Sequence, residues 1–224
     1  QQKMIPLESV MSKVWNKKIF EHIQKEVDQA SKNLAEERGA CPDAAEYGYN
    51  ERFSNKTAIA PTASISIICG GTSPGVEPIA ANSYTHKTLS GSFNVRNKYL
   101  KKLLAKHNKD NDETWSSITT NQGSISHLDF LTQEEKDVFK TAFELDQKWI
   151  VELGADRTPH ISQAQSINIF LPADVHKREL HQIHFQAWKK GLKSLYYCRS
   201  KSIQRAENVN DAKSTDITAN VYKS

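Results

Sequence analysis

The sequence lacks the features of membrane, secreted and disulfide-bonded proteins. No stretch approaches the about 20 consecutive apolar residues that a membrane-spanning helix requires. Residues 1–6 (QQKMIP) do not show the charged and then apolar pattern of a secretory signal. Only three cysteines occur among 224 residues, with no CxxC spacing, so neither a disulfide scaffold nor a zinc cluster is expected. Buried, reduced thiols in a cytoplasmic protein are the prediction for Cys41, Cys69 and Cys198.

The sequence also has no large excess of charge of one sign. Thirty basic residues face 26 acidic ones, and the Lys and Arg residues are scattered rather than gathered in a stripe with aromatic residues. Nucleic-acid binding is therefore not expected. His181 and His184 lie three residues apart on a predicted helix, but no third metal ligand stands near them, so no metal site is predicted. The chain begins without an initiator Met, as expected for a portion of a longer protein.

Two segments have strong helical patterns. Apolar residues at steps of three and four predict a long first helix with one buried face and Gly39 at its C-cap. That face would contain Trp15, Ile19, Ile23, Val27, Ala30 and Leu34. Thr132 and Glu135 form a capping-box sequence, which predicts one helix whose buried side runs from Val138 to Leu153 and which ends at Gly154.

Residues 166–198 predict a βαβ unit. Residues 166–171 (SINIFL) read as a buried strand, Asp174 as the N-cap of a helix that closes at Gly191, and residues 192–198 as a second strand. This order indicates an α/β architecture with parallel strands. Residues 206–224 are polar and predict a flexible tail.

A strand-like run at residues 57–60 stops at Pro61 and is followed by small and hydroxyl residues. Such a sequence can present unpaired backbone N–H groups at the start of a helix, which is a favourable anion site. Thr62 and Ser64 would add hydroxyl donors, and Ala63 would let a phosphate approach closely. In the alternative interpretation, Thr62 or Ser64 only caps the helix and no ligand binds. The local sequence leaves both open.

Five blocks resemble the large subunit of class I ribonucleotide reductases, in the same order along the chain. The blocks are residues 60–64 (APTAS), 73–78 (SPGVEP), 89–93 (LSGSF), 163–169 (QAQSINI) and 188–197 (WKKGLKSLYY). The resemblance extends from about residue 15 to residue 205. Members of this family reduce ribonucleoside diphosphates to deoxyribonucleotides by radical chemistry inside a ten-stranded α/β barrel. The resemblance implies that residues 1–205 form the C-terminal part of that barrel, with helices around parallel strands.

The resemblance also implies two functional sites. The substrate diphosphate loop would comprise Pro61, Thr62, Ala63, Ser64 and Ile65. Tyr196 and Tyr197 would pass a radical from the small subunit towards the active site. A phenol with a pKa near ~10 keeps its proton at neutral pH, so its oxidation must release the proton with the electron. Neighbours on an ideal strand point to opposite faces, so contact between the two rings requires a distortion near a strand end. Alternatively, the pair only packs a core.

Other required groups are missing from the sequence. No cysteine stands in the Asn-x-Cys-x-Glu context of the family's radical cysteine, and no redox pair follows Cys198. The implied partners are the N-terminal portion of the large subunit, a small subunit that carries the metal–radical cofactor, and a thioredoxin- or glutaredoxin-type reductant. No cofactor is expected on this chain. Glu77 is a residue that can orient a loop, without a catalytic role. The rival hypotheses are a non-catalytic module that binds nucleotide or phosphate and an inactive gene fragment.

Overall fold

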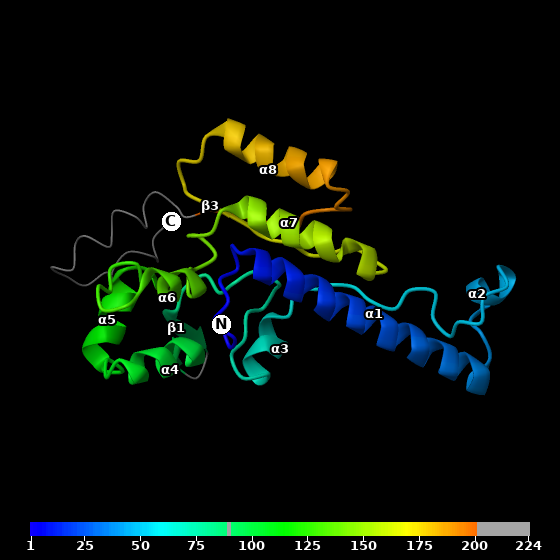
Figure 1. Ribbon diagram of the computed structural model, residues 1–224, viewed down its shortest axis with the longest axis horizontal. Helices are drawn as coiled ribbons and strands as arrows, with labels where there is room; N and C mark the ends of the chain where they lie inside the picture. The colour runs from blue at the N-terminus through cyan, green and yellow to red at the C-terminus, as the bar shows by residue number, and fades with distance from the viewer. Residues whose placement is uncertain (89–90, 201–224) are drawn as a thin grey trace, which may run out of the picture.

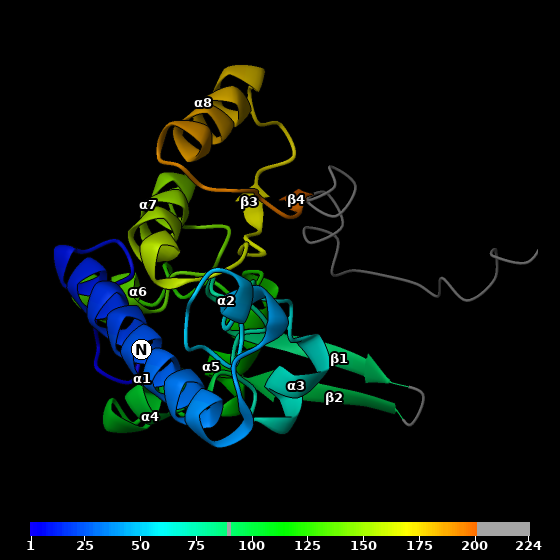
Figure 2. The same cartoon turned by 90° about the vertical axis from the view of Figure 1, so that its right-hand side faces the viewer.

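The computed structural model describes residues 1–88 and 91–200 of an α/β fold. Its longest element is helix α1 (Val10–Arg38), and helix α7 (Gln147–Arg157) packs beside it (Figure 1). Helix α8 (Lys177–Lys189) lies on α7, so the three helices form one layer. Strands β3 (Ile169–Leu171) and β4 (Cys198–Ser200) lie beside this layer (Figure 2).

Helix α1 ends at Gly39 as predicted, but its apolar stripe is not buried. Ser9 caps its N-terminus by accepting a hydrogen bond from the Ser12 N–H, and Gly39 ends it with a φ of 80°. Trp15, Ile19 and Ile23 are 37%, 48% and 39% exposed, so the prediction of a buried face is wrong for these residues. The reason is that α1 meets α7 through polar side chains. Lys13 pairs with Glu152 at 3.2 Å, and Asn16 donates to the Leu153 carbonyl at 2.9 Å.

The predicted helix over residues 133–153 is two helices. Thr132 and Glu135 form the expected capping box at the start of α6 (Gln133–Val138), which then ends at Phe139. The chain turns here because Asp146 caps a new helix, α7, by accepting from the Lys148 N–H at 2.9 Å.

Helix α7 also continues beyond Gly154, which was predicted as its end, to Arg157. A Cβ at Gly154 would lie only 2.8 Å from Ile167 Cδ1. This glycine therefore serves the close approach of α7 to the strand segment beside it, rather than helix termination.

The βαβ unit is confirmed, with shorter strands than predicted. Strands β3 and β4 are parallel, with Ile169 opposite Cys198, and α8 connects them. The N-cap of α8 is His176 rather than Asp174, because the His176 side chain accepts the Arg178 N–H. Residues 57–60 form only an isolated parallel bridge, in which Ile59 is opposite Gln165. We call residues 165–171 the central strand segment, since neighbours lie on both of its sides.

The remaining elements form a second part of the molecule. Two strands form an antiparallel ribbon, β1 (Ser83–Thr88) and β2 (Gly91–Arg96), which projects from the molecule (Figure 2). Helices α3 (Ala63–Ile68), α4 (Lys98–Lys106) and α5 (Asp112–Thr120) lie near the ribbon (Figure 2). Helix α2 (Pro42–Glu46) lies at the far end of α1 (Figure 1), and a 3-10 turn at Thr158–His160 follows α7 and contacts α1. Part of the block at residues 89–93 and the predicted tail at residues 206–224 lie outside the described residues.

The molecule has two separate hydrophobic cores. The first lies among α4, α5 and α6, and it includes Leu100, Leu104, Trp115, Ile118 and Phe139. The second lies among α7, α8 and the central strand segment, and it includes Ile150, Val151, Ile167, Ile169, Leu171 and Ile183. Within residues 1–88 and 91–200, the strands form one parallel and one antiparallel pair and no closed barrel. No described helix combines the length and apolarity needed to cross a membrane.

The first core makes a direct stability prediction. Leu100 is fully buried, so Leu100→Ala leaves a cavity and is expected to lower the free energy of unfolding by about 2–5 kcal/mol. Urea denaturation measures this change. Lys101→Ala, at the exposed next position of α4, is the control and should change stability by less than about 0.5 kcal/mol. Equal effects of the two substitutions would contradict the assignment of Leu100 to the core.

Candidate functional site

The central strand segment brings the two predicted site segments to its opposite sides. On one side, the Ile59 N–H donates to the Ala164 carbonyl and the Ser166 N–H donates to the Ile59 carbonyl. On the other side, the Tyr196 N–H donates to the Ile167 carbonyl at 2.7 Å. Two strand spacings amount to roughly 10 Å between the outer backbones. The loop that starts at Pro61 and the tyrosine pair therefore flank the same strand.

The rings of Tyr196 and Tyr197 contact each other. Their centroids are 4.2 Å apart and their planes meet at 58°. Both residues precede β4, which starts at Cys198, so they lie outside the regular strand and their side chains need not alternate. This is the strand-end distortion that contact requires. The rings are 48% and 53% exposed, which does not agree with the alternative that they only pack a core.

The two phenols also interact electrostatically. A hydrogen bond with Tyr197, and next the charge of the Tyr197 phenolate, raise the pKa of Tyr196 above its ordinary value. Arg199 acts in the opposite direction, and its guanidinium carbon lies 5.3 Å from the centre of the Tyr197 ring. The two contacting rings thus lie beside the positive charge of Arg199.

The predicted phosphate loop enters helix α3 without a side-chain cap. Thr62 occupies the N-cap position, but its N–H and its hydroxyl both donate to the Pro74 carbonyl, at 2.9 and 3.0 Å. The interpretation of Thr62 as a capping side chain is therefore wrong. Its proposed role as a hydroxyl donor to a ligand is also not available in this arrangement. Ser64 is exposed at the first turn, and no side chain caps the N–H groups there.

The sequence indicated Glu77 only as a residue that can orient a loop, and it did not indicate Arg157 or Gln165. Glu77 is only 4% exposed, and its carboxylate accepts hydrogen bonds from the Asn168 N–H at 2.5 Å and from the Asn168 side-chain amide at 3.4 Å. Arg157 is also 4% exposed and donates to Gln165 Oε1 at 2.6 Å. Burial lowers the pKa of Arg157 to about 10, against the opposing charges of Glu77 and Asp156. The one feature of the sequence that pointed to these buried polar groups was the acidic residue within residues 73–78.

The cysteines differ from expectation. Cys69 and Cys198 are exposed and Cys41 is partly exposed, so the prediction of buried thiols is wrong. Cys198 is exposed because nothing in residues 1–88 and 91–200 covers β4, all three residues of which are exposed. His181 and His184 are both exposed as well. No group of three His, Cys, Asp or Glu side chains in the described residues is placed to hold a metal ion.

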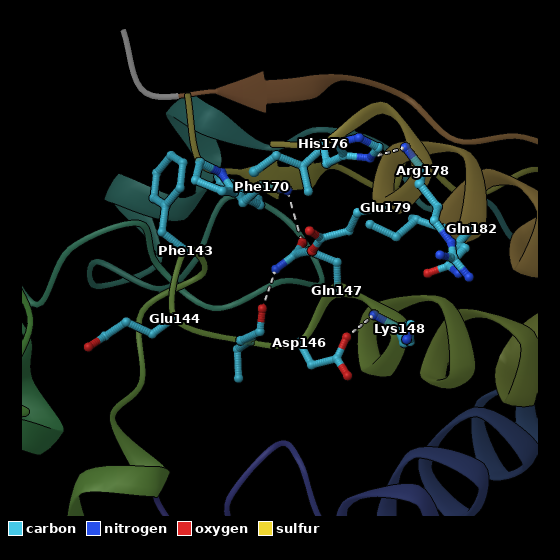
Figure 3. A pocket seen from close by; sticks show the side chains of 14 residues that line it. Phe143, Glu144, Asp146, Gln147, Lys148, Phe170, His176, Arg178, Glu179 and Gln182 are labelled. Atoms are coloured by element: carbon cyan, nitrogen blue, oxygen red, sulfur yellow. Dashed lines mark hydrogen bonds between the residues drawn. The ribbon is translucent and has the colours of Figure 1, made fainter. Parts of the chain in front are cut away.

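A separate pocket lies where α7 and α8 begin, at the end of β3. Its volume is about 560 Å³, and Gln147, Phe170, His176 and Arg178 contribute to its lining (Figure 3). Gln147 is fully paired, since its amide donates to the Ala142 and Leu145 carbonyls and its oxygen accepts the Phe170 N–H. None of the predicted site residues lines this pocket. A second pocket of about 390 Å³, between α3 and the ribbon, does have Ala63 in its lining.

Comparisons with known proteins agree on one family. The family described as ribonucleotide reductase, barrel domain, matches residues 43–198. The ribonucleoside-diphosphate reductase large subunits of Invertebrate iridescent virus 6 and Invertebrate iridescent virus 3 are 47% and 44% identical to the chain. These matches cover 93% and 96% of this chain.

A solved structure is also similar. The Actinobacillus ureae class Id ribonucleotide reductase alpha subunit matches with a TM-score of 0.82 and 36% identity, over 95% of this chain and 38% of its own. This chain spans only 22% and 34% of the two viral relatives.

The tyrosine contact predicts a measurable change in titration. Tyr197→Phe removes the hydroxyl that bonds to Tyr196, so the pKa of Tyr196 should fall towards its ordinary value. Carbon-13 NMR of the labelled phenol Cζ atoms measures this titration. Tyr47→Phe, at an exposed position beside α2, should leave the titration of Tyr196 unchanged. An unchanged pKa of Tyr196 in Tyr197→Phe would contradict the contact.

Proposed function

Because the chain belongs to the ribonucleotide reductase barrel-domain family, we propose that it is the C-terminal portion of a class I ribonucleoside-diphosphate reductase large subunit. In this role it takes part in the reduction of ribonucleoside diphosphates to deoxyribonucleoside diphosphates for DNA synthesis. The observation that carries the proposal is the arrangement around the central strand segment. A loop with uncapped N–H groups lies on one side, and two contacting phenols lie on the other.

We propose that residues 1–205 form the second, five-stranded half of a ten-stranded barrel. Ile59, the central strand segment and β4 are all parallel, which agrees with one half of such a barrel. The outer edge of β4 has no strand partner within the described residues. The exposed apolar residues of α1 and of α3, such as Ile68 at 83% exposure, also require a covering surface. The N-terminal portion of the large subunit is the proposed source of both.

The proposed diphosphate loop consists of Pro61, Thr62, Ala63, Ser64 and Ile65. Backbone N–H groups at a helix start and the Ser64 hydroxyl are suitable donors to phosphate oxygens. Thr62 has a different task, because its two donors hold the loop to the Pro74 carbonyl. Ala63 leaves space for a phosphate to reach the backbone.

The proposed radical relay uses Tyr196 and Tyr197. A phenoxyl radical on one oxygen accepts an electron and a proton from the other phenol, which becomes the radical in turn. The hydrogen bond between the phenols provides the path for the proton, and the ring contact at 4.2 Å provides the path for the electron. The pair is open to solvent in this chain, so a covering surface is needed to keep the radical dry.

The remaining groups of the reaction belong to other chains in this proposal. The radical cysteine comes from the N-terminal portion, the metal–radical cofactor from the small subunit, and the electrons from a thioredoxin- or glutaredoxin-type reductant. The cytoplasmic setting stays a prediction.

The loop assignment predicts weak binding of a ribonucleoside diphosphate to this chain. CDP should bind and cytidine should not, because the diphosphate supplies the contact. Ala63→Glu places a negative charge at the loop and should weaken CDP binding at least ~10-fold, about 1.4 kcal/mol. Ala105→Glu is the matched control, since Ala105 is also exposed, on α4. Isothermal titration calorimetry measures the affinities. Equal CDP affinity of the two variants would contradict the loop assignment.

The relay assignment predicts a loss of turnover in the assembled enzyme. This chain is combined with the N-terminal portion of a large subunit and a small subunit, and deoxynucleotide formation is measured. Tyr196→Phe and Tyr197→Phe should each lower the rate at least ~100-fold, about 2.7 kcal/mol in the barrier, while CDP affinity is retained. Tyr47→Phe should retain full activity. No deoxynucleotide with all three wild-type chains folded would favour a phosphate-binding module or an inactive fragment.

A further inference from the structure

Glu77 is a buried acid that links two parts of the candidate site. Its carboxylate accepts hydrogen bonds from the backbone N–H and from the side-chain amide of Asn168. Asn168 follows Ile167 on the central strand segment, and the Ile167 carbonyl accepts the Tyr196 N–H. The residue that binds the Glu77 carboxylate is therefore the immediate neighbour of Ile167, which pairs with Tyr196.

The segment that carries Glu77 also holds the start of α3. The Ser73 hydroxyl donates to the Glu77 carbonyl, which closes residues 73–77 into a tight loop. Pro74, within this loop, accepts both donors of Thr62 through its carbonyl. Asn168 is thus connected to Thr62 by hydrogen bonds at Glu77, Ser73 and Pro74, together with the backbone of the 73–77 loop that joins them.

Gly75 shows how closely the loop surrounds the carboxylate. A Cβ at Gly75 would lie 2.3 Å from Glu77 Oε2 and 3.8 Å from the Asn168 amide nitrogen. No side chain larger than hydrogen fits at position 75 while Glu77 keeps its present contacts. The φ of Gly75 is not positive, so the backbone itself would accept alanine.

Burial strengthens the hydrogen bonds between Glu77 and Asn168. Glu77 is almost fully buried, and hydrogen bonds to a carboxylate in a dry environment are stronger than bonds between neutral groups. Arg157 is equally buried and interacts favourably with the Glu77 charge. Removing the Glu77 carboxylate would leave the Asn168 donors without a partner, which is costly in a buried position.

We propose that Glu77 is a positioning residue. It fixes where the first turn of α3 lies along the central strand segment, on the side opposite Tyr196. It acts through the 73–77 loop and Thr62, and it does not touch the substrate. Its effect on substrate affinity rests on the proposed function, in which this turn binds the diphosphate. Its effect on the position of Thr62 does not.

The test combines hydrogen exchange with binding, in the chain without and with CDP. Glu77→Ala should raise the exchange rates of the Thr62 and Asn168 amides about 10-fold and weaken CDP binding about 10-fold. Glu77→Gln keeps an acceptor oxygen for the Asn168 N–H and should restore both quantities to within about 3-fold of wild type. Gly75→Ala displaces the carboxylate without removing it and should reproduce the defect of Glu77→Ala in part.

A destabilising variant elsewhere separates positioning from loss of stability. Ile118→Val, in the first core, should raise exchange of the Leu104 amide and leave the Thr62 amide unchanged. The proposal is wrong if Thr62 exchange is unchanged in Glu77→Ala, or if it rises only in proportion to that of Leu104. If wild type binds no CDP, the diphosphate loop fails as a function, while Thr62 exchange still decides the role of Glu77. If Glu77→Ala does not fold, Glu77→Gln and Gly75→Ala decide by the same measurements.

Discussion

The parallel hydrogen bonding of residues 165–171 is the constraint on which the rest of this structure depends. This segment accepts the Tyr196 N–H on one side and pairs with Ile59 on the other, so it sets the relative positions of both candidate site segments. It keeps its own place through the second core, because Ile167, Ile169 and Leu171 are buried against α7 and α8. Gly154 permits the required close approach of α7. A shift of this strand by one residue would displace both site segments relative to each other and bury the wrong side chains.

The local sequence patterns predicted the helices and strands better than they predicted which side chains are buried. The βαβ unit was predictable, because the helical period of α8, Gly191 and the apolar run before it all agree. The capping box at Thr132 was predictable for the same reason, but the apolar period continued past Phe139 and concealed the break before Asp146. Burial was not predictable. The apolar residues on one face of α1 and the Cys198 thiol are of types that are usually buried in proteins. Their burial depends on a covering surface that is absent from residues 1–88 and 91–200.

The site was predictable to a similar degree. The resemblance to reductase large subunits selected residues 61–65 and the two tyrosines, whereas neither spacing nor propensity could have brought them to one strand. The contact between Tyr196 and Tyr197 arises because β4 begins only after them. The tasks of Thr62 and Glu77 depend on the loop at residues 73–77, whose path is determined by contacts between distant segments. Such contacts leave no periodic signal, so an acidic residue within a turn-rich block was the only indication.

The account requires that the loop and the tyrosine pair occupy opposite sides of one strand in a fixed register. Scalar couplings across hydrogen bonds, measured by NMR on the deuterated chain, test this directly because each coupling identifies one donor and one acceptor. The account predicts one coupling between the Tyr196 nitrogen and the Ile167 carbonyl carbon, and another between the Ser166 nitrogen and the Ile59 carbonyl carbon. A coupling of Tyr196 to any other carbonyl, or of Ser166 to a residue outside the 57–60 segment, would contradict it.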